Sequence, residues 1–208
     1  MNDLADRRRE EKERRRDEIL DAAAAVVAEV GFEGLTMGLV AQVARVSRAL
    51  TYTYFKDTQA LQWALCERGL DLLLGRFITA CTGTTMGRAK LEAMGDAYIA
   101  FAQSEPVYFG ALAHFEAHPG DAACEWCAAD DKVHRFMTDA IREGMADGSI
   151  RADVGDPDAV ATVLWGFMHG VIQLVASKAP VLEQRGITPQ RLFEQAMAMA
   201  GAALQVTP

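Results

Sequence analysis

Apolar residues recur at helical spacing along most of the chain. Between Ile19 and Val30 they stand at positions i, i+4, i+7, i+8 and i+11, and a second stripe of this kind runs from Leu91 to Phe101. No segment alternates apolar and polar residues as a half-buried strand does. Glycine, proline and small polar residues interrupt the stripes and leave segments of about 12–25 residues. We therefore expect an all-α fold of about nine helices.

The early segments are short and closely spaced. The first helix is predicted over residues 14–30. Thr36 and Ser47 are residue types that cap helix N-termini, so they predict two further helices, over 36–44 and 47–54. Amphipathic helices joined this closely form a helix-turn-helix, whose second helix can enter the major groove of DNA.

A spaced pattern of many positions covers this region. It consists of Ile19-Leu20-Asp21-Ala22-Ala23, Gly31-Phe32, Leu35-Thr36-Met37, Val40-Ala41, Ala44, Val46-Ser47, Tyr52-Thr53-Tyr54-Phe55 and Ala60-Leu61. Over about residues 15–62 the chain resembles the N-terminal domain of the tetracycline-repressor (TetR) family of transcription regulators. The resemblance implies a homodimer that binds a palindromic operator in double-stranded DNA and is released by a small effector. On this basis we expect a charged arm (1–13), a helix-turn-helix domain (14–56) and an effector-binding and dimerisation domain (57–208).

The resemblance also implies DNA contacts. In such a motif the start of the helix predicted over 47–54 faces base edges. There, Arg48 could pair with a guanine or hold a phosphate, and Thr51 could meet a thymine methyl. Tyr52, Tyr54 and Lys56 resemble the family's phosphate-contacting positions, which fix register without reading sequence. The alternative for the two tyrosines is a place in the core. The expected DNA-binding residues are Thr36, Arg45, Ser47, Arg48, Ala49, Thr51, Tyr52, Tyr54 and Lys56.

Arg45 stands in the turn where the family usually has glycine. If the backbone is left-handed there, Arg45 adds strain of about 1 kcal/mol, or it offers an extra phosphate contact. The small core that fixes the angle of the helix over 47–54 is expected to contain Val40, Val43, Val46 and Phe55.

The charged N-terminal arm has two interpretations. Some family members contact the minor groove with a flexible arm, and Arg7 to Arg9 and Arg14 to Arg16 suit that role. The alternative is a solvated helical extension with Glu/Arg pairs four residues apart. Seven acidic residues among the first 20 balance seven basic ones, so any attraction to DNA depends on their local arrangement.

The larger domain carries aromatic and methionine side chains at helical spacing. Each one alone suits a bundle core, but as a set they also suit an adaptable apolar pocket for a lipophilic or aromatic effector. Trp165 and His169 share a helix face, and the Trp-x-x-x-His-Gly spacing resembles one seen in a branch of the family; the alternative for His169 is a satisfied core or interface histidine. The expected effector-binding residues are Met94, Tyr98, Phe101, Phe109, Phe115, Trp126, Trp165 and His169.

The last two helices, predicted over 156–177 and 189–205, are expected to form the dimer interface as a four-helix arrangement. Small residues permit close helix approach, and the last helix carries Ala196, Ala200, Gly201 and Ala203 beside Phe193, Met197 and Leu204.

A metal or thiol-redox sensor on the same scaffold is the main alternative function. His114, His118, Cys124 and Cys127 are ligand types that zinc uses, but a single Cys-x-x-Cys is a weak indication. A helical enzyme is less favoured because no phosphate-binding loop, nucleophile elbow or His-Glu-x-x-His motif is present. We expect no cofactor.

The charge distribution is uneven. The chain has a net charge of −8, which alone argues against a nucleic-acid binder. Residues 1–57 hold 10 basic and 11 acidic residues, whereas the remainder holds 11 and 18. The excess acid therefore lies outside the DNA-binding motif. We expect a cytoplasmic protein with reduced cysteines, because the N-terminus lacks the apolar core of a signal peptide and no uncharged apolar run of about 18 residues suggests a membrane span.

Overall fold

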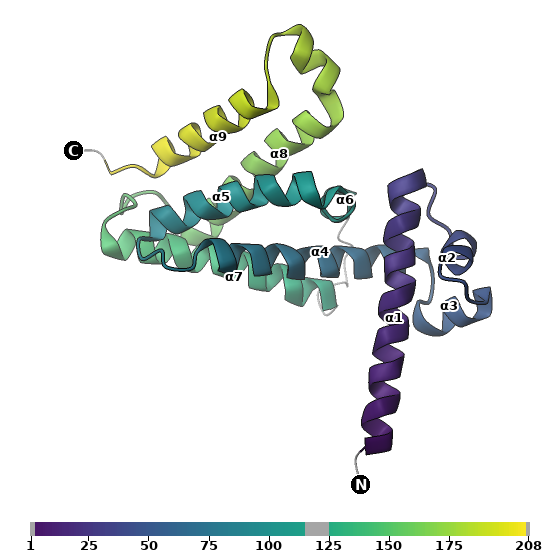
Figure 1. Ribbon diagram of the computed structural model, residues 1–208. Coiled ribbons are helices and arrows are strands. Elements are labelled where there is room, and N and C mark those ends of the chain that lie inside the picture. Colours follow the sequence, from purple (N-terminus) through teal and green to yellow (C-terminus); the bar gives the residue numbers. More distant parts are fainter. Residues whose placement is uncertain (1–2, 115–124, 207–208) are drawn as a thin grey trace. The chain divides into compact units, whose positions relative to one another are not determined.

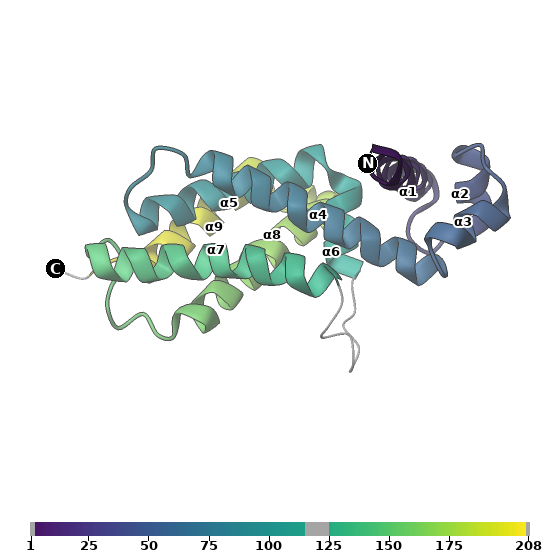
Figure 2. The ribbon, with the colours of Figure 1, turned by 90° about the horizontal axis from the view of Figure 1, so that it is seen from below.

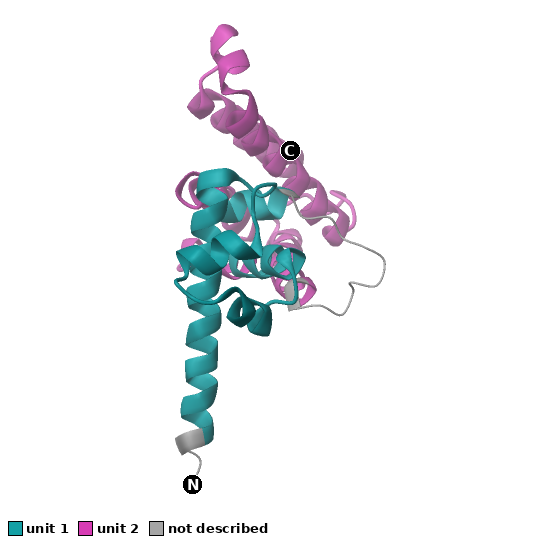
Figure 3. Ribbon diagram, turned by 90° about the vertical axis from the view of Figure 1, so that its right-hand side faces the viewer, with its two compact units in different colours: residues 1–69, 107–122 teal, residues 70–106, 123–208 magenta. Residues whose placement is uncertain are grey.

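The computed structural model describes residues 3–114 and 125–206. Within these residues the chain forms nine α-helices and no strand, so the all-α prediction is confirmed (Figure 1). The chain divides into two compact units, residues 1–69 with 107–122 and residues 70–106 with 123–208 (Figure 3). The helices are α1 (Asp3–Val30), α2 (Met37–Val43), α3 (Arg48–Tyr54), α4 (Thr58–Ala80), α5 (Gly87–Ser104), α6 (Pro106–His114), α7 (Glu125–Asp147), α8 (Pro157–Gln184) and α9 (Pro189–Leu204).

The first unit contains the predicted helix-turn-helix. Thr36 caps α2 by accepting a hydrogen bond from the Leu39 backbone N–H at 3.2 Å, and Ser47 caps α3 by accepting one from Leu50 at 3.1 Å. The buried face of α1 packs against α2, which in turn packs against α3. The caps therefore start both short helices where the sequence predicts, because each satisfies a backbone donor that the first turn leaves open.

The core of this unit differs from the prediction at one position. Val40 and Phe55 are buried as expected, and Val46 is half-buried. Val43, however, is 47% exposed, so its assignment to the core is wrong. The buried positions of α2 are Met37, Val40 and Ala41, and Val43 falls outside this spacing of three and four residues.

Two predicted helix ends are displaced. The first helix begins at Asp3 instead of near residue 14, so the charged arm is helical from that point on. The α8 helix runs to Gln184, but Lys178 has non-helical dihedrals (φ −126°, ψ 20°), and Pro180 follows (Figure 1). Proline lacks the backbone donor and its ring crowds the preceding turn, so the regular part of α8 ends near the predicted Ser177.

The second unit is a bundle in which α5 packs on α7 and α9, and α8 packs on α7 and α9 (Figure 2). The α5 and α7 helices approach most closely at two glycines. A Cβ on Gly87 would lie 2.1 Å from the Gly144 backbone nitrogen and 2.3 Å from the Ala140 carbonyl oxygen. Only glycine fits at the start of α5, because both neighbours are backbone atoms that cannot rotate away.

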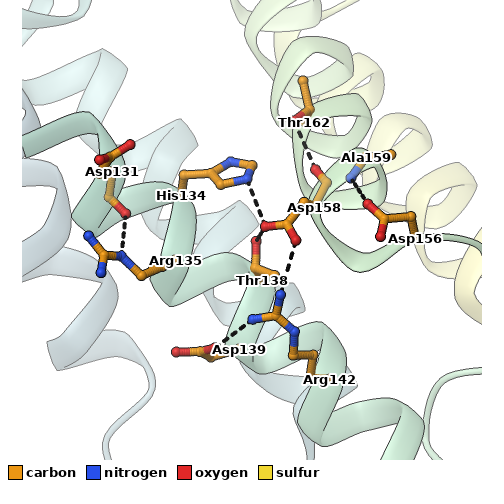
Figure 4. Close-up of polar contacts among 10 residues, drawn as sticks. All are labelled: Asp131, His134, Arg135, Thr138, Asp139, Arg142, Asp156, Asp158, Ala159 and Thr162. Atoms are coloured by element: carbon orange, nitrogen blue, oxygen red, sulfur yellow. Dashed lines mark hydrogen bonds and ion pairs between the residues drawn. The ribbon is translucent and has the colours of Figure 1, made fainter. Parts of the chain in front are cut away.

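A polar cluster fixes α7 against the start of α8 (Figure 4). Asp158 accepts hydrogen bonds from the Thr138 hydroxyl at 3.2 Å and from Arg142 at 3.0 Å, and its carboxylate lies 3.3 Å from His134 Nε2. Asp156 caps α8 by accepting from the Ala159 backbone N–H at 3.0 Å. Thr138 is fully buried, so its hydroxyl depends on Asp158 for a partner.

Candidate DNA interface and effector pocket

The exposed face of α3 carries three of the nine predicted DNA-binding side chains. Arg48 and Ala49 are exposed, and Tyr52 is 45% exposed. Arg48 Nη2 donates to the Tyr52 hydroxyl at 3.3 Å, and its guanidinium carbon lies 5.7 Å from the centre of the Tyr52 ring. This contact holds the two side chains together on one face of α3. Thr36, Arg45, Ser47 and Lys56 are exposed around it, and Tyr54 is half-buried.

Thr51 does not belong to this surface. Its side chain is fully buried, and its hydroxyl donates to the Arg48 carbonyl oxygen at 2.7 Å. The expectation that Thr51 meets a thymine methyl is therefore corrected, because the residue faces the core of the unit. Thr53 is exposed one turn after Ala49 and was missed by the sequence analysis. Its spacing of four residues from Ala49 places it on the same helix face.

Arg45 has φ 55° and is the one described non-glycine residue with a positive φ. The left-handed turn that the family pattern implies is thus formed without glycine. Its backbone N–H donates to the Gln42 carbonyl oxygen at 3.2 Å, and the next N–H, of Val46, donates to Ala41 at 3.0 Å. These two bonds close α2 and start the turn into α3.

The second unit encloses an apolar cavity of about 60 Å³ among α5, α7, α8, α9 and the end of α4. Met94, Tyr98 and Trp165 line it, as predicted from the sequence. The wall also contains residues that the sequence analysis did not assign to a pocket, with three further methionines among them. These additional residues are Phe77, Leu91, Glu92, Gly95, Met137, Leu164, Met168, Met197, Ala200, Gly201 and Leu204.

Tyr98 of the cavity wall forms a polar pair with His169, which was also predicted to bind the effector but does not itself line the cavity. The Tyr98 hydroxyl is 2.6 Å from His169 Nδ1, and the rings of Trp165 and His169 lie 5.4 Å apart. Burial raises the pKa of Tyr98, against the smaller effect of a hydrogen bond from Trp165, and burial lowers the pKa of His169. Both groups are therefore neutral near pH 7. The indole can only donate, so Tyr98 accepts from Trp165; the direction of the bond between Tyr98 and His169 Nδ1 depends on the tautomer of the imidazole.

The other predicted effector residues are not at the cavity. Phe101 is fully buried and stacks on Tyr98 with 6.5 Å between ring centres, but it does not line the wall. Phe109 is buried in the other unit. Phe115 and the side chain of Trp126 lie outside the described residues. The aromatic residues of the pocket therefore come from α4, α5 and α8 alone, within the part of the chain that the structure describes.

Part of the last helix lines the cavity. Ala196 and Gly201 are buried, and Met197, Ala200, Gly201 and Leu204 line the cavity. These residues face the interior of the unit, whereas Ala203 is exposed, so a dimer contact through the last helix stays a prediction. The sequence analysis missed this because α9 has small residues around much of its circumference, so spacing alone does not say which side is buried.

The proposed metal ligands lie mostly outside the described residues. This applies to His118, Cys124 and the side chain of His114. Cys127 is half-buried, Cys66 and Cys81 are buried, and none of the three forms a disulfide with a described residue. Among the described residues no group of three or more metal-ligating side chains comes together.

Two family models match the chain. Residues 19–64 match the bacterial regulatory proteins of the tetR family, and residues 91–200 match the tetracyclin repressor-like C-terminal domain. The chain therefore belongs to the TetR family of transcription regulators. It is a DNA-binding regulator, not an enzyme. No curated protein sequence matches the chain.

Solved structures with the same fold span nearly the whole chain. A protein of unknown function from Rhodococcus sp. RHA1 is 26% identical with a TM-score of 0.77, over 92% of this chain and 96% of that one. FadR from Bacillus subtilis, solved in complex with stearoyl-CoA, is 14% identical with a TM-score of 0.72, over 90% and 98% of the two chains. The ketosteroid regulator KstR2 of Mycobacterium tuberculosis is 20% identical with a TM-score of 0.67, over 93% and 96%.

Proposed function

We propose that this protein is a dimeric repressor that a small apolar effector releases from a palindromic operator. The observation that carries the proposal is the apolar cavity in the second unit, where Tyr98 of the wall pairs with His169 behind it. In a DNA-binding regulator, such a cavity serves a ligand that favours the DNA-incompetent state and shifts the population toward it.

On the DNA side, Arg48 is the residue that reads sequence. It lies near the start of α3, exposed, with a planar group that suits guanine O6 and N7. Tyr52, Tyr54, Lys56 and Thr36 hold phosphates and fix the register. The hydrogen bond from Arg48 to Tyr52 restricts the guanidinium before DNA arrives, which lowers the conformational entropy lost on binding.

The cavity wall defines the chemistry of the effector. Glu92 is its one charged lining residue, and Arg88 donates to that carboxylate at 3.0 Å. The buried part of the effector is therefore apolar, with one group that accepts from or donates to the His169–Tyr98 pair. Stearoyl-CoA in the FadR structure and the name of the ketosteroid regulator are consistent with large apolar ligands on this fold.

The cavity must enlarge to hold such a molecule. Pockets for small molecules have volumes of about 300–1,000 Å³, against about 60 Å³ here. Four methionines, Met94, Met137, Met168 and Met197, line the wall. Their unbranched side chains change shape readily, so the effector opens the cavity by moving them, and this movement is the first step of release from DNA.

A second copy of the chain covers the outer face of α8. The α8 helix contains an 18-residue window with a mean hydropathy of 1.7, enough by length and composition to cross a membrane, yet only 22% of that window is buried. Its exposed apolar residues include Val163 at 68% and Leu174 at 49%, which stand at i and i+11 on one face. A homodimer through this stripe removes them from water.

Two measurements test the proposal. The protein should shift a duplex of its own upstream DNA in a salt-sensitive manner, and a hydrophobic ligand extracted from the purified protein or found by thermal-shift screening should reverse the shift. Tyr98→Phe should weaken that ligand by about tenfold, because it removes one hydrogen bond to a buried group, and should leave DNA affinity unchanged. Ligand binding that leaves the DNA complex intact would contradict the proposal.

A further inference from the structure

The charges on the first half of α1 are sorted by face. Arg8, Lys12, Arg15 and Arg16 stand at i, i+4, i+7 and i+8, so they lie on one side of the helix with no acidic residue among them. We call this set the basic stripe. Asp6, Glu10, Glu13 and Asp17, at i, i+4, i+7 and i+11, lie on another side. The balance of seven acids against seven bases in the first 20 residues therefore hides two faces of opposite sign.

The basic stripe continues directly into the buried face of α1. Ile19, Ala23 and Val26 follow Arg8 at i+11, i+15 and i+18, and all three are buried in the unit that contains α2 and α3. The stripe thus lies on the side of α1 that faces the helix-turn-helix. In Figures 1 and 3 the N-terminal half of α1 extends past the end of α3.

The junction between the stripe and α3 is fixed by Arg16. Its guanidinium carbon lies 5.3 Å from the centre of the Phe55 ring, and Phe55 is the C-cap residue of α3. On the acidic side, Asp17 and Asp21 accept from Arg68 of α4 at 2.8 and 2.5 Å. Both sides of α1 are therefore held, and its rotation about its own axis is set. From Arg16 to Arg8 the stripe runs for about 12 Å along the helix.

Ion pairs within the described chain account for half of the stripe, because Arg15 lies 2.7 Å from Glu18 and Arg16 lies 3.6 Å from Glu67. They do not account for the other half. Arg8 and Lys12 are exposed and form no ion pair with any described residue. They are also like charges four residues apart, an arrangement that destabilises an isolated helix. The face with mixed signs behaves differently: Arg14 donates to Glu11 at 2.6 Å and to Glu18 at 3.0 Å. A polyanion is the partner that such a row of cations fits.

We propose that the basic stripe is a second DNA contact of this regulator, in which α1 lies along the phosphate backbone beside the half-site that α3 reads. The inference rests on the proposed function of the helix-turn-helix, whose surface the stripe extends. It differs from a flexible arm, because a helix of fixed rotation presents its cations at constant spacing. The contact adds affinity and salt dependence but no base preference.

The test compares two double variants of the full-length protein that remove equal charge from one helix. Arg8→Gln with Lys12→Gln removes the two exposed cations of the stripe. Arg7→Gln with Arg14→Gln removes two cations from the face with mixed signs. DNA affinity is measured by fluorescence anisotropy between 50 and 200 mM salt, on the duplex of upstream DNA that the wild type binds. Circular dichroism checks that α1 stays helical in both.

In the proposed dimer the double variant removes two phosphate contacts from each protomer, four in all. This should reduce the slope of log K against log[salt] by about 3.6 and the affinity lost over this salt range by about 150-fold. The mixed-face variant should match the wild type. Equal salt slopes in all three proteins, or equal losses of DNA affinity in both variants, would overturn the proposal. So would a stripe variant that changes the oligomeric state without DNA, because the stripe would then bind another protein chain. If the wild type itself binds no DNA, the proposed function fails before the stripe is tested.

Discussion

At the residue scale, the backbone of Arg45 stores strain in the turn between α2 and α3. Its φ of 55° is a conformation that glycine adopts at no steric cost. Arg45→Gly should raise the free energy of unfolding by up to about 1 kcal/mol, as measured by chemical denaturation. Arg45→Ala keeps the strain and removes the guanidinium, so a loss of DNA affinity in both variants assigns a phosphate contact to the side chain. A glycine variant less stable than the alanine variant would show that the strain is relieved in some other way.

His169 makes the stability of the fold depend on pH. Burial lowers the pKa of this imidazole below its ordinary value of 6.5. As the pH falls through that value, the unfolded chain takes up a proton that the folded chain resists, so stability present above about pH 6.5 is lost with a slope of up to about 1.4 kcal/mol per pH unit.

His169→Gln should remove this part of the pH dependence while keeping a polar partner for Tyr98. The measurement is the difference between the unfolding free energies of wild type and variant from pH 7.5 to pH 5. Subtraction cancels the contribution of the other histidines. Parallel curves would mean that His169 does not resist protonation in the folded protein.

At the scale of single elements, helix starts that carry a capping residue were easier to predict than the start of an exposed helical segment. Thr36 and Ser47 start α2 and α3 because the capping side chain and the donor it satisfies lie within one turn. The start of α1 was placed too late because its first turns have no apolar stripe, and hydrophobic spacing does not report a helix whose sides face water. The sequence contained the relevant pattern in its charges, which repeat at three and four residues.

The crossing of α5 and α7 gives an element-scale prediction. Gly87→Ala should cost about 3 kcal/mol, the upper end of overpacking costs, because its Cβ would meet backbone atoms of Gly144 and Ala140. Gly75→Ala, in α4, is the matched control. A Cβ there meets nothing within 4 Å, and helix propensity should stabilise the chain by up to about 1 kcal/mol. Thermal unfolding of both variants checks the sign, and equal effects would contradict the close approach.

The pocket was predicted in part, for reasons that differ between elements. Tyr98, Met94 and Trp165 were recognised because they are large apolar residues at helical spacing. The α9 contribution was assigned to the dimer, since Met197 and Gly201 are also what a helix interface requires. Which of two apolar sides faces the interior depends on how four helices pack, and spacing within one helix does not contain that information.

At the scale of the whole molecule, the exposed stripe of α8 predicts the assembly. Val163→Glu with Leu174→Glu should convert a dimer into a monomer, because two copies would bring buried like charges together. Ile78→Glu is the control, since Ile78 is 52% exposed on α4 and lies outside the stripe. Light scattering after size exclusion gives the mass. A dimer that survives the double variant would place the interface elsewhere.

The division of the chain into two units bears on how such regulators diversify. Every described residue of the DNA surface falls within the first unit, and every residue of the cavity wall falls within the second. Substitutions at Met137 or Met168 can therefore alter the molecule that is sensed while the operator stays the same. Natural selection, or a laboratory that builds biosensors, can search these positions independently of Arg48. A variant that binds a new effector can then control the same operator.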